Sequence, residues 1–188
     1  MRAVVQRVAS ASVSVDGQVI SRISRGLMVL VGIGKGRSDD NESDVSTLTN
    51  KLLSLRVFSD PTDSAKMWKT SIKDVDGDIL CVSQFTLMAE TRKSNKFDFH
   101  NAMSTEQSRV LYETFLETLR RSYKPEKVQD GRFGAMMNVS LTNEGPVTFT
   151  LDSRRFEYIP RAAEITKQPK NQTSGDSTVE ASASTRIQ

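Results

Sequence analysis

The sequence is poor in the residues from which many active sites are built. Its 188 residues include one cysteine, Cys81, and one histidine, His100. A lone cysteine excludes an internal disulfide or a CxxC pair, and one histidine cannot supply a multi-histidine metal site. A Ser-His-Asp triad would have to recruit His100, whose surroundings, "DFHNAM", lack a nucleophile-elbow pattern. We therefore expect no metal and no cofactor, and a chemistry of hydroxyls, backbone amides and the substrate's own groups.

Long apolar runs are also absent. No stretch of about 18 apolar residues occurs, so the sequence predicts no membrane-spanning helix. The first residues, "MRAVVQRVAS", lack the apolar core of a signal peptide, and a single cysteine suits a reducing compartment. We therefore expect a cytoplasmic protein.

A large charge imbalance is missing as well. The net charge is +3, and residues 153–188 hold six basic and four acidic side chains. Proteins that wrap duplex DNA carry a larger basic excess, which argues against DNA as a partner. Basic side chains gather at 91–96 and 120–127. These clusters are either solvated faces or a surface for nucleic acid.

The patterns that are present favour β-strands. The first 33 residues alternate apolar and polar side chains, and Asp16-Gly17 is a hairpin signal. Residues 133–153 are expected to form two strands joined by a Gly145-Pro146 turn. The other predicted strands are 2–8, 11–24, 26–33, 56–58 and an apolar segment at 78–89, "DILCVSQFTLMA".

Two segments have helical periodicity. In 38–58, capping and acidic residues precede an apolar face of Val45, Leu48, Leu52 and Leu55. In 104–123, Ser104 and Gln107 have capping-box spacing ahead of a stripe of Val110, Leu111, Phe115 and Leu119. The sequence therefore predicts an α+β, β-rich single domain with two main helices over residues 1–152. Residues 153–188 are polar and poor in aromatics, so we expect a flexible C-terminal extension.

The stretch "SQFTL" places polar groups in an apolar segment. Ser83, Gln84 and Thr86 interrupt it. One interpretation is a strand with one polar face or a hydrogen-bonded core residue. The other is a strand end that aims a hydroxyl, an amide and backbone N–H groups into a pocket, where they can hold an ester carbonyl and its developing oxyanion.

Several motifs together resemble the D-aminoacyl-tRNA deacylases over about residues 1–152. They are "QRV" near the start, "KLLSLRVF" after the first helix, "SQFTL", "GRFGAMM" and "NEGPVT", in that order, with "NE" where the family usually has "ND". The resemblance implies a homodimer of barrel-like subunits with two active sites at the interface. It also implies hydrolysis of the ester between a D-amino acid and the terminal adenosine of tRNA, and of glycyl-tRNA mischarged on tRNA(Ala). This activity is chiral proofreading, a form of translation quality control.

The resemblance also implies roles for individual residues. Ser83, Gln84, Phe85 and Thr86 would line the carbonyl side of the pocket. Gly145 and Pro146 would form a cis bond that reaches into the partner subunit's pocket and excludes the Cβ of an L-amino acid by clash. Phe133 and Met137 match positions near the adenosine, and Arg7 matches an arginine that steadies the Gly-Pro loop.

Two catalytic schemes and one non-catalytic role remain. Thr86 Oγ is a nucleophile, or the Phe85 and Thr86 amides hold the carbonyl while the adenosine 2′-hydroxyl helps to direct water. The absence of an obvious base for Thr86 favours the second scheme. The alternative to an enzyme is a non-catalytic nucleic-acid-binding module, because relatives with C-terminal extensions resemble DNA-unwinding-element binders.

Overall fold

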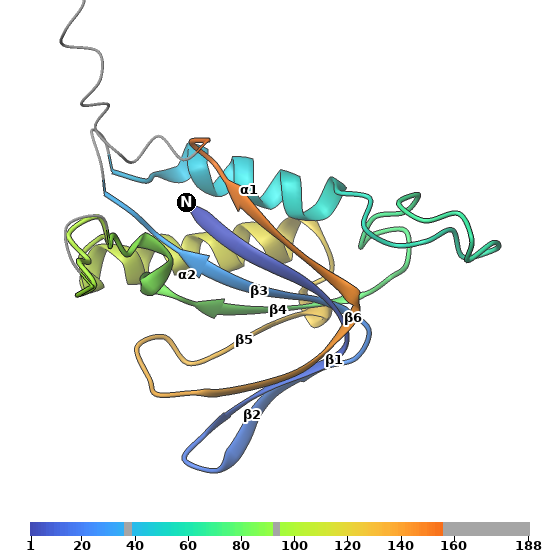
Figure 1. Ribbon diagram of the computed structural model, residues 1–188, viewed down its shortest axis with the longest axis horizontal. Helices are drawn as coiled ribbons and strands as arrows, with labels where there is room; N and C mark the ends of the chain where they lie inside the picture. Colours follow the sequence, from blue (N-terminus) through green and yellow to red (C-terminus); the bar gives the residue numbers. More distant parts are fainter. Residues whose placement is uncertain (36–38, 92–94, 156–188) are drawn as a thin grey trace, which may run out of the picture.

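A curved mixed sheet that nearly closes into a barrel forms the centre of the molecule (Figure 1). The computed structural model describes residues 1–35, 39–91 and 95–155. The elements are β1 (Arg2–Val15), β2 (Gln18–Ile23), β3 (Gly26–Gly32), α1 (Glu42–Ser54), β4 (Asp78–Ser83), the 3-10 helix η1 (Phe85–Met88), α2 (Thr105–Ser122), the 3-10 helix η2 (Pro125–Lys127), β5 (Val128–Asp130) and β6 (Asn138–Asp152). The predicted α+β, β-rich, barrel-like domain with two main helices is confirmed. The homodimer stays a prediction.

The sheet runs in the order β2-β1-β3-β4-β5, and β6 pairs with β1 outside this path. The β3–β4 and β4–β5 pairs are parallel, and the pairs that β1 makes are antiparallel. Helices α1 and α2 cover one face of the sheet (Figure 1). Neither of these helices has the length and apolarity that a bilayer span requires.

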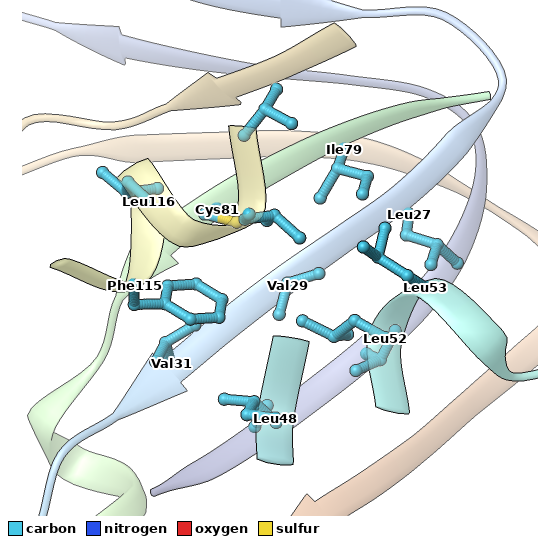
Figure 2. Close-up of a cluster of buried hydrophobic side chains, with 14 of the residues drawn as sticks. Leu27, Val29, Val31, Leu48, Leu52, Leu53, Ile79, Cys81, Phe115 and Leu116 are labelled. Carbon is cyan, nitrogen blue, oxygen red and sulfur yellow. The ribbon is translucent and has the colours of Figure 1, made fainter. Parts of the chain in front are cut away.

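Strand β3 is buried on both faces, as the central strand of a covered sheet should be. Leu27, Val29 and Val31 point toward the helices, where they meet leucines of α1 and Phe115 of α2 (Figure 2). Met28, on the opposite face, packs in a second cluster with residues of β1, β2 and β4. The helices therefore bury one face of β3, and residues of β1, β2 and β4 bury the other face.

Strand β3 also approaches β4 very closely at its first residue. Gly26 pairs with Asp78, and a Cβ on Gly26 would overlap the Asp78 carbonyl oxygen. Only glycine permits this parallel pairing. The pairing sets the register of β4 against β3, and in that register Ser83 lies opposite Val31.

Four predicted strands, 2–8, 11–24, 56–58 and 78–89, differ from the structure. Strand β1 is continuous from Arg2 to Val15, because β6 pairs along nearly its whole length. Segment 56–58 contributes a single bridge, between Phe58 and Thr70, and no strand. Segment 78–89 leaves the sheet after Ser83, and its second half is η1.

The final predicted hairpin is also wrong. Residues 138–152 form one strand, β6, and both halves pair with β1. The register of this pairing shifts on each side of Val8, between Gln6 and Val8 and between Val8 and Ser10. The Gly145-Pro146 pair therefore lies in an irregular stretch within a long strand rather than in a turn between two strands.

Both predicted helices are confirmed, with changes in their faces. In α1 the fourth buried apolar residue is Leu53, because Leu55 lies beyond the helix as its C-cap. In α2 Val110 is 65% exposed, and the aromatic ring of Tyr112 takes its place in the core. The Ser104 hydroxyl bonds the Gln107 side chain instead of completing the predicted capping box.

The N-terminus of α1 contains an aspartate with an altered pKa. Asp44 accepts from the Asn41 amide, closing a capping box, and from Ser153 and Arg154 at the end of the described chain. Burial alone would raise the pKa of Asp44, but these hydrogen bonds outweigh it and lower the pKa well below the ordinary value of 3.8. The ionised carboxylate therefore stabilises the fold.

We expect the free energy of unfolding to fall as the pH drops below about 4, by on the order of 2 kcal/mol for this group. The folded pKa is depressed, so the stabilisation is present above the unfolded pKa and is lost as the pH falls toward the folded one. Urea unfolding at pH 7 and pH 3 tests this, with Asp44→Asn and the exposed Glu113→Gln as a control. The deficit of Asp44→Asn relative to the unsubstituted chain should shrink at pH 3. A constant deficit at both pH values would contradict the assignment.

Candidate active site

The "SQFTL" residues lie where β4 ends and η1 begins. Ser83 is the last residue of β4, and Phe85 and Thr86 open η1. The turn is held against β3, since the Gln84 amide donates to the Val31 carbonyl at 2.7 Å. Arg2 also holds it, donating to the Leu87 carbonyl at 2.9 Å. The segment is therefore a strand end, as the second of the two sequence interpretations requires, and the pocket of that interpretation stays a prediction.

Two backbone amides of this turn are available to a ligand. In the part of the chain that the structure describes, the N–H groups of Phe85 and Thr86 have no acceptor. The first amides of a helix lack partners within the helix, so such groups donate to water or to a ligand. Phe85 and Thr86 are both exposed. Two adjacent free donors on a fixed turn can stabilise an oxyanion.

The Thr86 hydroxyl has a donor beside it and no base. Its Oγ accepts from the Gln84 side-chain amide at 2.5 Å. An amide N–H group cannot remove a proton, so this contact does not activate the hydroxyl for attack. His100 contacts Asp98 and Glu90 instead. Cys81 is fully buried, and burial raises the pKa of its thiol, which leaves it unreactive.

The "GRFGAMM" loop packs beside the same end of β4. The Gly131 amide donates to the Cys81 carbonyl at 2.9 Å. Met137 folds back over this point, accepting a hydrogen bond from the Arg132 amide at its sulfur and packing with the cluster that contains Val82. The Phe133 ring lies 5.7 Å from that of Tyr112. Met137 therefore lies beside Val82, next to Ser83, and Phe133 of the same loop packs against α2.

The Gly145–Pro146 bond is cis, and the residues around it are anchored. Arg7 Nε lies 3.3 Å from the Glu144 carbonyl oxygen and 3.2 Å from its carboxylate, and Arg7 Nη1 donates to the Val57 carbonyl at 2.6 Å. The Asn143 side chain donates to the carbonyls of Arg7 and Val147, each at 3.1 Å. Gly145 and Pro146 themselves are exposed.

Sequence reasoning found Arg7 but missed some of its companions. The Asn143 side chain, before the Gly-Pro bond, donates to the Val147 carbonyl after it. Arg25, which lies between β2 and β3, has its Nε 3.5 Å from the Glu144 carboxylate. The carboxylate of Glu144 thus lies between two arginines. The acidic side chain before Gly-Pro was visible in the sequence as a partner for an arginine. Nothing local marks Arg25 as a neighbour of Glu144, or the Val57 carbonyl as an acceptor for Arg7.

The structure does not bring the two motifs together within one chain. The η1 turn is tied to Arg2 at the start of β1, and the Gly-Pro segment is tied to Arg7. Five residues of strand separate these anchors, or about 17 Å. In Figure 1 β4 runs toward the left of the view, and β6 bends on the right. Ser83, Gln84, Phe85 and Thr86 lie together at the end of β4, with the loop of Phe133 and Met137 bonded to the same strand at Cys81. Arg7, Gly145 and Pro146 form a separate group.

The described residues hold no cluster of three or more histidine, cysteine, aspartate or glutamate side chains suited to a metal ion. The residues at the end of β4 and in the 131–137 loop present hydroxyl, amide, thioether and aromatic groups. This donor set suits the binding of an ester and a nucleoside.

Comparisons with known proteins agree on the family. The model of the D-Tyr-tRNA(Tyr) deacylase family matches residues 4–152. The D-aminoacyl-tRNA deacylase of Saccharomyces cerevisiae is 53% identical over 153 residues, covering 81% of this chain and 99% of the relative. That of Dictyostelium discoideum is 51% identical over 154 residues, covering 82% and 99%. The chain belongs to the D-Tyr-tRNA(Tyr) deacylase family.

Two solved structures are similar. One, named c-Myc DNA Unwinding Element Binding Protein, has 49% identity and a TM-score of 0.76, covering 81% of this chain and 98% of the other. The second, described as a probable eukaryotic D-amino acid tRNA deacylase, has 19% identity and a TM-score of 0.69, covering 80% and 97%. The second similarity bears on the fold alone.

Proposed function

We propose that this protein hydrolyses the ester bond of D-aminoacyl-tRNA, releasing the D-amino acid and free tRNA. The observation that carries the proposal is the pair of unpaired amides at Phe85 and Thr86, on a turn fixed to β3. Family membership supplies the substrate class, since curated relatives about half identical to this chain are D-aminoacyl-tRNA deacylases.

In the proposed mechanism the amides do the main work. The ester carbonyl binds to the Phe85 and Thr86 N–H groups, which stabilise the oxyanion that forms when water attacks. The adenosine 2′-hydroxyl helps to direct that water, and Ser83 and Gln84 line the carbonyl side. The adenosine lies against Phe133 and Met137. Thr86 Oγ is held by the Gln84 amide and does not attack. Aminoacyl esters are labile, so positioning and oxyanion donors suffice.

We further propose that the working unit is a homodimer with its active sites at the interface. The Gly-Pro segment lies about 17 Å along β1 from the η1 turn of its own chain, so it serves the pocket of a second copy. No residue of β6 is fully buried, although the strand has 15 residues. Among the described residues β6 pairs with β1 alone. A second subunit would cover this strand.

The Gly-Pro backbone, held by Arg7 and Asn143, would then act as a wall in the partner's pocket. A rigid wall excludes a substituent by clash and needs no matching attraction. An L-amino acid would point its Cβ into the wall, a D-amino acid would point it away, and glycine has none. The same site would therefore accept glycyl-tRNA mischarged on tRNA(Ala), and the cytoplasmic role would be proofreading.

A deacylation assay on matched D- and L-tyrosyl esters of one tRNA tests the proposal. A Cβ clash costs about 1–3 kcal/mol, so the D ester should be hydrolysed about fivefold to a hundredfold faster than the L ester. The glycyl ester should be cleaved as well. Equal rates for the D and L esters would rule out the wall, and intact D ester would rule out the enzyme.

The second candidate function is a non-catalytic nucleic-acid-binding module. It is favoured by the name of one similar structure, c-Myc DNA Unwinding Element Binding Protein. The same assay separates the two, because a binding module would leave the D ester intact.

A further inference from the structure

Arg109 is an exposed arginine on α2 that lies over the Phe133 ring. Its guanidinium carbon is 4.7 Å from the ring centroid. A Cβ built on Gly134 would lie 3.8 Å from Arg109 Nη2, so the guanidinium also covers the next residue of the loop. A cation over an aromatic face is held there by the ring quadrupole. The contact fixes a long and otherwise mobile side chain beside the proposed adenosine position.

This guanidinium is not used by the fold. Glu106 and Glu113 stand three and four residues from Arg109, the spacing at which helical ion pairs form. Across residues 1–35, 39–91 and 95–155, however, Arg109 makes neither an ion pair nor a hydrogen bond. Its N–H donors are therefore open to a ligand, while its orientation is set by Phe133.

A second cation lies in the same loop. Arg132 is exposed and directly precedes Phe133. Its backbone amide is tied to the Met137 sulfur, and its guanidinium has no acidic partner in the described parts of the chain. Phe133 itself packs against Tyr112, which is 2% exposed. One free guanidinium thus lies over an aromatic ring that the core holds in place, and a second exposed arginine directly precedes that ring in the loop.

We propose that Arg109, assisted by Arg132, binds the phosphodiester on the 5′ side of the terminal adenosine. The inference rests on the proposed function, which places that adenosine against Phe133 and Met137. In an aminoacyl-tRNA the amino-acid carboxyl is esterified, so the anionic groups near the acceptor end are backbone phosphates. The planar fork of a guanidinium matches a phosphate in two-point geometry. Arg109 is then a positioning residue for the acceptor end.

The test measures binding without hydrolysis. The probes are the dinucleotide CpA and CpA with an uncharged methylphosphonate linkage, which differ in one negative charge. The unsubstituted protein should bind CpA about tenfold more tightly, and Arg109→Gln should remove most of this preference. Arg109→Gln should also make the negative slope of log K against log salt concentration shallower by about 0.7. Arg109→Lys keeps the charge and loses the planar guanidinium, so its preference for charged CpA should lie between those of the unsubstituted protein and Arg109→Gln.

A matched control lies on the same helix. Arg121 is exposed, has no ion pair among the described residues, and lies about 18 Å along α2 from Arg109. Arg121→Gln should retain the full preference for the charged linkage. Equal affinities for both probes in the unsubstituted protein, or equal effects of the two substitutions, would overturn the inference.

Hydrolysis gives an independent readout. On D-tyrosyl-CpA, Arg109→Gln should raise KM about tenfold with kcat nearly unchanged, and on D-tyrosyl-adenosine it should change neither. A loss of kcat/KM of equal size on both esters would overturn the phosphate contact. If the protein prefers charged CpA through Arg109 but cleaves neither ester, the phosphate site is supported and the proposed function is wrong.

Discussion

Replacing Gly145 by valine is expected to abolish the hydrolysis of D-aminoacyl-tRNA. Gly145 has φ of +122°, a conformation that L side chains rarely adopt. A Cβ at this position would lie 2.8 Å from Val147 Cγ2 and 3.1 Å from Arg7 Nη2. The segment would have to move away from its anchors, and a displacement of about 1 Å at a reacting site costs about a hundredfold in rate.

The assay uses the D ester of one tRNA, with the variant first shown to be folded and to have the oligomeric state of the unsubstituted protein. Gly17→Ala is the matched control, since Gly17 has φ of +77° and a Cβ there would meet nothing within 4 Å. The control should lose about 1 kcal/mol or more of stability and keep its activity. A Gly145→Val protein that retains its rate and still rejects the L ester would show that the wall lies elsewhere.

Phe85→Pro is expected to lower kcat for the D ester by about a hundredfold to a thousandfold, the usual cost of removing one oxyanion donor. Proline removes the Phe85 N–H, and it is tolerated at the first position of a helix. The preceding residue, Gln84, has φ −144° and ψ 83°, outside the α region that proline disfavours before it. The substitution therefore deletes the donor with little change in the turn.

Two companions separate the amide from the side chains. Phe85→Ala removes the ring, which lies 5.0 Å from that of Phe99, and keeps the amide. Thr86→Ala removes the hydroxyl and keeps its amide. Both should stay within about tenfold of the unsubstituted rate, or about 1.4 kcal/mol in barrier. A folded Thr86→Ala protein that binds substrate and turns over none would make the hydroxyl essential and the amide mechanism wrong.

Local patterns in the sequence predicted the elements whose packing is local. The apolar stripe of α2, apart from the exposed Val110, follows from periodicity that a short window contains. A short window does not predict that β6 is one continuous strand, because this depends on pairing with β1 more than a hundred residues away. A Gly-Pro pair between two apolar runs is the usual signature of a turn, and distant pairing overrides it.

The candidate site was predictable by motif and not by placement. The residues of "SQFTL" and "NEGPVT" were identified from sequence, and the resemblance matched Arg7 to the Gly-Pro loop. Nothing in these motifs shows that β4 ends beside Arg2, about 17 Å along β1 from that loop. That separation follows from strand register. Arg109 was equally hidden, since an exposed arginine near a helix start is unremarkable until the fold brings Phe133 beneath it.

The close approach of β3 to β4 has a consequence for how tolerance to mutation would be interpreted. Gly26 pairs with Asp78, the first residue of β4, whereas Ser83 is the last, so Gly26 lies five residues along the strand from the candidate site. A side chain there would push apart the pair of strands that delivers Ser83 to its position. In a survey of variants scored by activity, position 26 would look as constrained as position 145. Cellular abundance would distinguish them, because Gly26 variants would be lost from the soluble pool while Gly145 variants would accumulate as inactive protein.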